Sequence, residues 1–598
     1  MVGVGCDRST GVKSEMSVHM SSMFDAMKAY DVADKLVELL SLSEIPNNYA
    51  HPAVKPKSRI KFPRVPKKCS FYGRPIVQHK FSLVAAALAV LCFFRIEPLA
   101  QRSSNTRPRR SATEAVSQRE NTVPRTIPKT WDNEAMESLE LPLATPAATP
   151  KQVSADYYYA IPVRAIYKPY PWYAPGRQPA RYIERLRQQE PEIIWGVDRK
   201  GREHKPPLKT EADWIQAGKL VFEAPIFSLP PDQFFQKPLP IDIRTTKDGV
   251  IPFDPLVIRE KGKIELGIAS CAECHTRVMA DGMILQGAQG NYPTDQAAFL
   301  FLSPRGLESL RNHTREFFSA PWLRPDPNAP VQEMSLEDMR AVVGSYPSGV
   351  VSRFGSSALY PVHVPDLIGV KDRRYLDGTG LQQHRSIVDL MRYAALNQGA
   401  SGLASYGGFI PSGGPDYSTL PDPTAFTRYS DEQLYALALF LYSLQPPLNP
   451  NKLDAVAVRG QKVFEREGCG TCHTPPLYTN NKLTPAEGFK IPEDHLKRYD
   501  ILPVSVRTDP NVTMKTRRGT GYYKVPSLRG VWYRSMFGHS GWCATLEDWF
   551  DARRLRDDYV PTGFKGYGVK TLAVRGHEFG LKLSDEDKSD LIAFLKTL

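Results

Sequence analysis

The chain has 598 residues, of which 41% are apolar and 24% charged, and it contains 8 Cys and 52 Pro. This length allows about two to four domains with real hydrophobic cores, and so few Cys exclude a small disulfide scaffold. The net charge of +13 is concentrated near the N-terminus, because residues 1–110 contain eighteen Lys and Arg against eight Asp and Glu. The remaining sequence is nearly balanced, which argues against a basic nucleic-acid groove.

Residues 1–80 form a basic N-terminal extension, with nine Lys and Arg and no acid between Ala50 and Phe81. An apolar run, 81–94, follows this extension. A basic flank before an apolar run of this length is typical of a secretory signal, and the run is short for a membrane span. We therefore expect residues 81–100 to be a signal peptide or signal anchor, with translation starting near Val77; a buried core helix is the alternative. The protein is then periplasmic or secreted, held at the inner membrane only if 81–94 is retained.

Two further stretches are rich in residues that break regular structure. Residues 101–155 are rich in Ser, Thr, Pro and Arg, a composition that predicts a disordered linker. The run Pro446-Pro447-Leu-Asn-Pro450 stops any helix that precedes it. We therefore place a domain boundary there, which divides the folded part into 156–447 and 448–598.

These two parts contain an internal repeat. Segments 214–222 and 458–464 each place a Gly four residues before a Phe in a short helical pattern. Each part then ends with a helix that Ser caps, Ser430 in the first and Ser584 in the second. Apolar residues recur at helical spacing in both closing helices and predict one buried face in each: Leu434, Leu437, Leu441 and Leu444, and Leu591, Phe594, Leu595 and Leu598. Because long alternating strand patterns are scarce, we predict a mainly α fold with long irregular loops.

Four of the eight Cys lie in two Cys-x-x-Cys-His motifs, Cys271-Ala-Glu-Cys274-His275 and Cys469-Gly-Thr-Cys472-His473. Two thiols three residues apart can add to the two vinyl groups of haem, and the adjacent His then supplies the proximal iron ligand. The sequence therefore predicts two covalently bound haem c groups, with each Cys pair as an attachment site and each adjacent His as an iron ligand. Cys543 stands alone and is expected to be a small core residue.

Zinc binding and dithiol redox chemistry are the alternatives for these motifs. A zinc ribbon places its Cys pairs about 15–20 residues apart, whereas these pairs lie almost two hundred residues apart. A thioredoxin-like motif needs a βαβ setting, and no such pattern is visible. Both His residues and the predicted export favour haem attachment.

The second axial ligands decide what each haem does. A haem with two strong protein ligands transfers electrons, whereas a haem with an open site can bind peroxide or dioxygen. No His closely follows His275, which favours an open first haem, although Met279 or Met283 could close it. In the second part, His577 lies between two Gly just before the closing helix and is the candidate second ligand.

Two haem motifs in a duplicated, exported chain resemble the bacterial di-haem cytochrome c peroxidase superfamily, which includes the MauG-type enzymes and the rubber oxygenases. Residues 524–549, with Lys-Val-Pro-Ser-Leu-Arg, His-Ser-Gly and Ala-Thr-Leu-Glu, are similar to the family segment K-V-P-T-L-R-N … H-D-G … A-T-L-E. Residues 364–378 resemble T-P-T-V-x-N … F-W-D-G. The resemblance covers about 210–598, and the long interval between the haem motifs is closest in layout to the rubber-oxygenase-like branch.

This resemblance implies two cytochrome c-like haem domains and a peroxidase-type oxidoreductase. The haem at 271–275 would be catalytic, and the haem at 469–473 would be its electron-transfer partner with His577 as second axial ligand. His539 matches a structural His of the family, although an exchange of roles with His577 stays open. Calcium at the domain interface is common in the family, but this sequence has no dedicated acidic loop for it.

The sequence departs from the family between the haems and in the catalytic pocket. The family's inter-haem Trp aligns with Leu376, and Tyr375 is the aromatic candidate to replace it. The family's distal His and Glu are missing, and His384 and Arg385 stand in that neighbourhood as a candidate catalytic pair, because peroxide cleavage needs a proton acceptor and a charge stabiliser. The alternative is that His384 caps a helix and Arg385 pairs with Asp389 four residues later.

Three functions stay open from the sequence. In the first, an exported oxidoreductase reacts with peroxide or dioxygen at the first haem, takes electrons from a small redox protein through the second, and in its oxygenase form acts on a hydrophobic organic substrate. The second is a pure electron-transfer cytochrome. The third is a Tyr-rich partner-docking module at 156–260 with structural haems.

Overall fold

The computed structural model describes residues 126–598 except 230–241, 302–306, 309–310, 312–317, 353–355 and 412–426. These residues belong to one unit, Arg109–Leu598. The predicted extension 1–80, the predicted signal segment 81–100 and the first part of the predicted linker lie outside the described residues. In the described part, no helix is long and apolar enough to cross a membrane.

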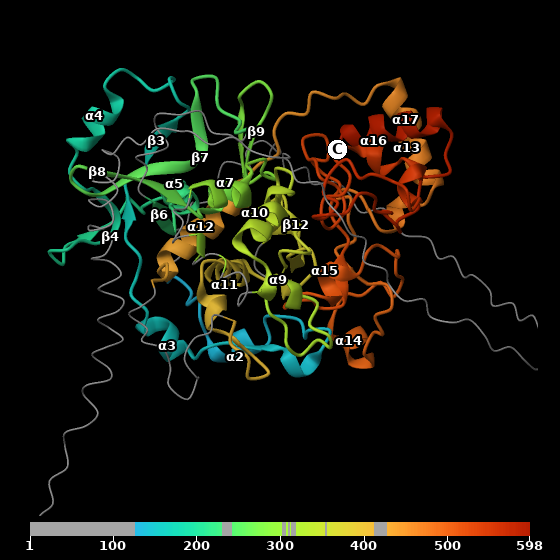
Figure 1. The fold of residues 1–598 in the computed structure, drawn as a ribbon, viewed down its shortest axis with the longest axis horizontal. Coiled ribbons are helices and arrows are strands. Elements are labelled where there is room, and N and C mark those ends of the chain that lie inside the picture. The colour runs from blue at the N-terminus through green and yellow to red at the C-terminus, as the bar shows by residue number, and fades with distance from the viewer. Residues whose placement is uncertain are drawn as a thin grey trace, which may run out of the picture. The chain divides into compact units, whose positions relative to one another are not determined.

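Each half of the described chain is built on a pair of crossing helices (Figure 1). In the first half, α5 (Glu211–Glu223) packs against α12 (Asp431–Ser443). In the second half, α13 (Ala455–Arg466) packs against α17 (Asp585–Lys596). The two pairs contain the repeated segments, so the internal repeat is confirmed as a structural repeat.

The repeated Gly explains how closely these helices cross. A Cβ atom at Gly218 would lie 2.0 Å from the carbonyl oxygen of Ala436, and one at Gly460 would lie 1.8 Å from that of Asp590. No side chain fits at those distances, so only Gly lets the two backbones touch. Four residues later, a Phe of each first helix packs against a Phe of the closing helix, with ring centroids 5.2 Å apart in the first half and 5.4 Å in the second.

The closing helices begin as their sequences predict. The side chain of Ser430 accepts a hydrogen bond from the N–H of Gln433, and the N–H of Ser430 donates to the side-chain oxygen of Gln433, which completes a capping box. Ser584 accepts from the N–H of Asp587 at 3.1 Å. Both predicted apolar faces pack into the core: Leu434, Leu437, Leu441, Leu591, Phe594 and Leu595 are buried, and Leu444 and Leu598 are half-buried against the same clusters.

The prediction of a mainly α fold is incomplete, because the first half also contains an antiparallel sheet (Figure 1). Its strand order is β3 (Tyr170–Tyr173), β7 (Val250–Glu260), β8 (Lys263–Ile268) and β6 (Phe227–Leu229). Pro252 and Pro255 interrupt the apolar pattern of β7, and this is why its sequence does not show a clean alternation.

The other elements are short. A three-stranded sheet comprises β2 (Ile166–Tyr167), β4 (Ile193–Val197) and β5 (Glu203–His204). The strand pairs are β1 (Pro150–Lys151) with β15 (Ser405–Tyr406), β9 (Thr276–Val278) with β10 (Ile284–Gln286), β11 (Val350–Val351) with β12 (Val362–His363), β13 (Tyr375–Leu376) with β14 (Gln382–Gln383), and β16 (Leu483–Pro485) with β17 (Tyr522–Lys524). The remaining α-helices are α2 (Asn133–Glu137), α3 (Ala155–Ala160), α4 (Tyr182–Arg187), α6 (Cys271–Cys274), α7 (Thr294–Phe301), α9 (Ala329–Glu333), α10 (Leu336–Gly344), α11 (Ile387–Asn397), α14 (Glu493–Arg498), α15 (Asn511–Met514) and α16 (Leu546–Trp549).

The predicted linker 101–155 extends too far into the folded part. Trp131 is only 1% exposed and stacks on Tyr158 with ring centroids 4.3 Å apart. Leu139 and Leu141 are fully buried, and β1 pairs with β15. The Pro-rich composition of this stretch concealed a few large apolar residues, which anchor it to the core, so the folded part includes residues 130–155.

Candidate functional site

The first Cys-x-x-Cys-His motif lies on the one-turn helix α6. The hydroxyl of Ser270 accepts a hydrogen bond from the N–H of Glu273 at 3.1 Å and caps this helix. His275 follows directly, and its Nδ1 donates to the carbonyl oxygen of Pro365 at 3.0 Å. This bond orients the ring and leaves Nε2 as the metal-binding nitrogen. Burial lowers the pKa of His275 to about 4, so the imidazole is neutral at neutral pH.

The second motif has the same local geometry. It begins in a 3₁₀ turn, Cys469–Thr471, and Nδ1 of His473 lies 3.1 Å from the carbonyl oxygen of Pro526 and 3.2 Å from that of Tyr478. Burial lowers the pKa of His473 as well. Both motif histidines are therefore held by a proline carbonyl in the orientation that an axial iron ligand needs.

The motif thiols are not set up for thiolate chemistry. Burial raises the pKa of Cys271 to about 11 and that of Cys469 to about 11. Reactive dithiols have lowered pKa values, so a redox dithiol is disfavoured. Among the described residues, no three or more His, Cys, Asp or Glu gather as a metal-binding group.

Both motifs open into a single cavity of about 1410 Å³. A site for one small molecule usually measures about 300–1,000 Å³, so this cavity is large enough for a bigger occupant or for two. All four motif thiols and both motif histidines line it. Apolar side chains, among them Leu367, Leu441, Phe464 and Leu595, complete its wall. Two tethered haems, which are flat and mostly apolar, fit a cavity with these attachment points and this lining.

His577 faces His473 across the cavity. Their ring centroids are 6.3 Å apart, and two imidazoles that bind one metal through bonds of about 2 Å have centroids about 6 Å apart. Neither ring nitrogen of His577 has a hydrogen-bond partner among the described residues, and Nδ1 is fully buried. Its φ of +45° is unusual for a residue other than Gly. Residues with such strained backbone conformations cluster at functional sites. These observations fit the predicted role of His577 as second axial ligand.

Arg554 holds the loop that carries His577, a role that was not predicted from the sequence. It is fully buried, and its guanidinium donates to the carbonyl oxygens of Trp549 and His577 at 2.8 Å each and to that of Val574. The N–H of His577 donates to Val506 at 2.7 Å.

His539 is engaged with protein groups, unlike His577. Its Nε2 lies 2.9 Å from the hydroxyl of Thr508, and its ring stacks on Tyr523 with centroids 3.5 Å apart. Burial lowers the pKa of His539 to about 3. These contacts favour a structural role for His539 over an exchange of roles with His577.

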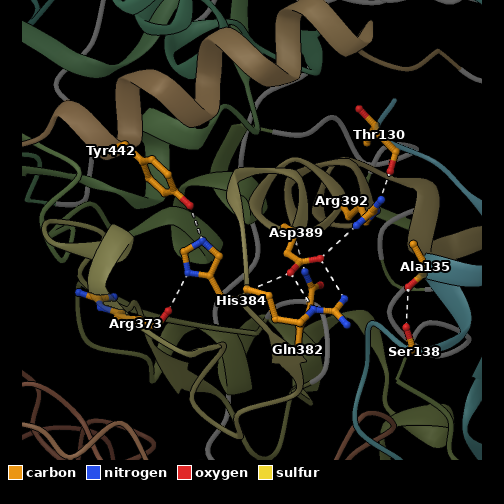
Figure 2. Close-up of polar contacts among 10 residues, drawn as sticks. Thr130, Ala135, Ser138, Arg373, Gln382, His384, Asp389, Arg392 and Tyr442 are labelled. Carbon is orange, nitrogen blue, oxygen red and sulfur yellow. Dashed lines mark hydrogen bonds and ion pairs between the residues drawn. The ribbon is translucent and has the colours of Figure 1, made fainter. Parts of the chain in front are cut away.

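The structure places the predicted catalytic pair His384 and Arg385 away from the cavity. Figure 2 shows His384 between Tyr442, whose hydroxyl donates to Nε2 at 2.7 Å, and the carbonyl oxygen of Arg373, which accepts from Nδ1 at 2.8 Å. Arg385 pairs with Asp389 at 3.0 Å, as the alternative interpretation predicted. Neither side chain lines the cavity. His384 does not cap a helix either, because Ser386 precedes α11.

Other candidates near the haem sites also point away from the cavity. Successive residues of a strand face opposite sides: Leu376 lines the cavity, whereas the hydroxyl of its neighbour Tyr375 accepts from the N–H of Asp500 at 2.8 Å. Tyr375 therefore does not replace the family's inter-haem Trp. Met279 and Met283, which could have closed the first haem, do not line the cavity. Cys543 is fully buried in a core cluster, as predicted.

The two halves are joined by a pair of equivalent hydrogen bonds that the sequence analysis did not foresee. The N–H of His363, two residues before Pro365, donates to His539 of the second half at 3.1 Å. The N–H of Lys524, two residues before Pro526, donates to Gly378 of the first half at 3.1 Å. The acceptor Gly378 lies thirteen residues after Pro365, and the acceptor His539 lies thirteen residues after Pro526. The loops that hold the motif histidines therefore cross with local pseudo-two-fold symmetry, and their shared pattern V-P-x-L-x-G-V was the available signal.

No protein-family model and no curated protein matches the sequence. The chain shows 17% identity to each of three solved structures. These are hydrazine synthase from Kuenenia stuttgartiensis under xenon pressure (49% of this chain, 87% of that chain, TM-score 0.25), a MauG-like protein associated with microbial copper homeostasis (50%, 89%, 0.25) and the diheme peroxidase BthA from Burkholderia thailandensis (71%, 94%, 0.27). TM-scores this low do not establish a shared fold, so the functional argument rests on the geometry of the site. None of the three is described as a rubber oxygenase, and the expectation of that branch gains no support.

Proposed function

We propose that this chain is a di-haem c-type oxidoreductase of the peroxidase type. The observation that carries the proposal is the cavity shared by two Cys-x-x-Cys-His motifs, each with its His oriented by a proline carbonyl. When bound, the two haems supply iron centres that react with peroxide or dioxygen and transfer electrons. The chain tethers both groups in one cavity and supplies their axial histidines.

The axial ligands assign different roles to the two sites. Among the described residues, a second imidazole lies against His473, and none makes ring contact with His275. His577 lies seven residues before the helix cap Ser584, and the equivalent place in the first half is residue 423, in the segment 412–426 outside the described residues. That segment contains neither His nor Met. A haem held by His275 would therefore keep an open position for peroxide or dioxygen, and a haem held by His473 and His577 would suit electron transfer.

The overall reaction that we propose is peroxide reduction. Two electrons and two protons convert hydrogen peroxide into two molecules of water, and the electrons come one at a time from a small redox protein through the second haem. Covalent haem attachment and the apolar run at 81–94 favour a periplasmic or secreted location. The docking hypothesis for 156–260 is less favoured, because Tyr157 and Tyr158 of its Tyr-rich start are buried.

The test is to produce the chain with the machinery for c-type haem attachment and to measure its mass, its visible spectrum and its turnover. We expect the mass of two haems, a Soret shift on adding cyanide, and consumption of hydrogen peroxide with a reduced cytochrome as donor. Replacing Cys271 and Cys274 by Ser should abolish the cyanide-sensitive species, whereas the matched change at Cys469 and Cys472 should retain it. A colourless protein contradicts the proposal, and two haems without any cyanide response indicate a pure electron carrier.

A further inference from the structure

Four basic side chains gather where the two halves cross, and each has an equivalent in the other half. The reference points are Pro365 in the first half and Pro526 in the second. Arg373 and Arg534 lie eight residues after these prolines, and His363 and Lys524 lie two residues before them. All four side chains line the cavity. Neither haem attachment nor axial ligation uses any of them.

The two arginines are anchored in the same way. Arg373 donates to the carbonyl oxygen of Asp366 and, at 2.9 Å, to that of Ile368. Arg534 donates to the carbonyl oxygen of Ser527 at 2.8 Å. Asp366 and Ser527 both directly follow the proline of their half. These bonds fix one edge of each guanidinium, while Nε of Arg534 stays buried without a partner.

The crossing brings basic groups of opposite halves within electrostatic reach of one another. Burial and then the charge of Arg373 lower the pKa of Lys524 to about 7, against the opposing effect of Asp377. Burial is also the main cause of the lowered pKa of His363, and the charges of Arg534 and Lys524 contribute to it. The ammonium of Lys524 has no hydrogen-bond or ion-pair partner among the residues that the structure describes.

Three acids lie near these cations; Asp372 is exposed to solvent, and the other two are engaged with neutral donors. Asp366 accepts from the hydroxyl of Tyr533 at 2.6 Å and from the N–H of Ile368 at 2.9 Å. Asp377 accepts from the hydroxyl of Tyr393 at 3.2 Å. Buried cations require counter-ions, and these two carboxylates do not pair directly with Arg373, Arg534 or Lys524. The junction therefore carries an excess of positive charge that faces the cavity.

We propose that Lys524, Arg373 and Arg534 bind the propionate carboxylates of both haems at this junction, an inference that rests on the proposed function. Vinyl and propionate groups stand on opposite edges of the porphyrin, so a haem tethered through its vinyl carbons presents two carboxylates away from its Cys pair. Arginine and lysine are the side chains that pair most strongly with carboxylates.

The crossed arrangement makes this group of cations common to both haems. Lys524 belongs to the second half but lies beside Arg373 of the first, so removing its charge acts on both cofactors. A nearby positive charge favours the reduced form of a haem, because reduction makes the iron centre more negative. Loss of the charge at Lys524 therefore shifts both reduction potentials to more negative values.

The experiment uses fully loaded protein with haem that carries ¹³C at the propionate carboxylates. Infrared difference spectra on reduction, and potentiometric titration of both haems, are compared for wild type, Lys524→Met, Arg373→Gln and the control Lys490→Met. Lys490 is exposed and does not line the cavity, so its variant removes the same charge from the surface. We expect shifted propionate bands and more negative potentials in the first two variants, wild-type behaviour in the control, and near-wild-type behaviour in Lys524→Arg.

Unchanged bands and potentials in Lys524→Met and Arg373→Gln that carry two haems overturn this inference and leave the proposed function intact. A wild-type protein without haem overturns the proposed function instead. If the Lys524→Met variant does not mature, the wild-type bands decide: propionate frequencies of freely solvated carboxylates overturn the inference, and frequencies of ion-paired carboxylates support it.

Discussion

The two halves of the molecule share the parts that hold a cofactor and differ in the parts that would use it. Both have a crossing helix pair with a contact Gly, a Cys-x-x-Cys-His motif, and a proline carbonyl that orients the motif histidine. They differ opposite that histidine, where the second half presents His577 and the first has no equivalent His or Met in its sequence. In the proposed function, the repeated features would therefore hold the cofactors, and the features that are not repeated would give the two sites different roles.

The interval between motif and proline loop shows the same division. The motif histidine and its proline are 90 residues apart in the first half and 53 in the second. The longer interval contains α7, α9 and α10, and Phe299 and Val343 from these helices line the cavity. In the proposed function, this part of the cavity wall, which the second half lacks, would contact a substrate of the first haem and so influence which substrate binds.

The largest expected effect comes from removing the ligand that distinguishes the halves. Replacing His577 by Gly should abolish one low-spin signal in the low-temperature EPR spectrum and make the second haem able to bind cyanide. His539→Gln is the control, because His539 bonds to Thr508 and should leave that signal in place. An unchanged spectrum in the His577 variant contradicts its role as a ligand.

The next prediction tests whether the helix crossings of the two halves are equivalent. Gly460→Ala should lower the free energy of unfolding by about 3 kcal/mol or more. The new Cβ would lie 1.8 Å from the carbonyl oxygen of Asp590, so the two helices would have to separate. Gly218→Ala should have a similar effect in the first half. Gly344→Ala, with no atom within 4 Å of the new Cβ, is the control for chemical denaturation. Equal stability of all three variants would mean that the crossings are not tight.

Arg554 offers a way to loosen the His577 loop without touching the ligand. Arg554→Met removes a buried donor from three carbonyl groups and should cost about 2–4 kcal/mol. It should also broaden the low-spin EPR signal of the second haem, because the ring of His577 loses its fixed orientation. Arg553→Met, whose side chain is 79% exposed, should change neither quantity. A sharp, unshifted signal in the Arg554 variant would show that other contacts fix the loop.

One contribution to the pH dependence of stability should come from His384 of the first half. Burial holds the pKa of His384 below its ordinary value of about 6.5, so the unfolded chain takes up a proton more readily than the folded protein. The stability that His384 contributes is therefore complete above about pH 6.5 and falls as the pH falls. Denaturation from pH 7 to pH 4 should show a shallower loss in His384→Gln than in wild type, and an identical slope would contradict this.

The smallest effect is expected at Asp254, in the sheet that the second half lacks. Burial, and then the neighbouring Glu273, raise the pKa of Asp254 well above its usual range, so the carboxyl holds its proton to a higher pH than an ordinary aspartic acid. Asp254→Asn, which imitates a neutral acid, should change the free energy of unfolding by less than about 1 kcal/mol. Asp254→Ala, which leaves a cavity, should cost more. A large loss in Asp254→Asn at pH 7 would show that the carboxyl is ionised.

The helix pairs and their caps were predicted correctly because each is encoded within about a dozen neighbouring residues. The structure places the four motif Cys, His275, His473 and His577 around one cavity, and haem attachment there stays a prediction. The sequence did not show that His384 and Arg385 lie away from the cavity, because sequence position says nothing about which way a side chain faces. The sheet was missed because proline disrupts the alternation in β7.

The crossing of the loops was missed for a different reason. It depends on hydrogen bonds between backbone groups almost 150 residues or more apart, Lys524 to Gly378 and His363 to His539, and backbone groups leave no mark on residue identity. The duplicated V-P-x-L-x-G-V segment was visible in the sequence, but its two copies could be matched to each other only once their partners were known.

This crossing has a consequence for dissecting the protein. A chain cut in the run Pro446–Pro450 would yield two fragments, each of which lacks the backbone carbonyl, of His539 or of Gly378, that the other half supplies to its proline loop. Neither fragment would rebuild a closed pocket alone, whereas mixing the two would restore one. The two halves should therefore behave as a fragment-complementation pair, and their reassociation would report whether the junction has formed.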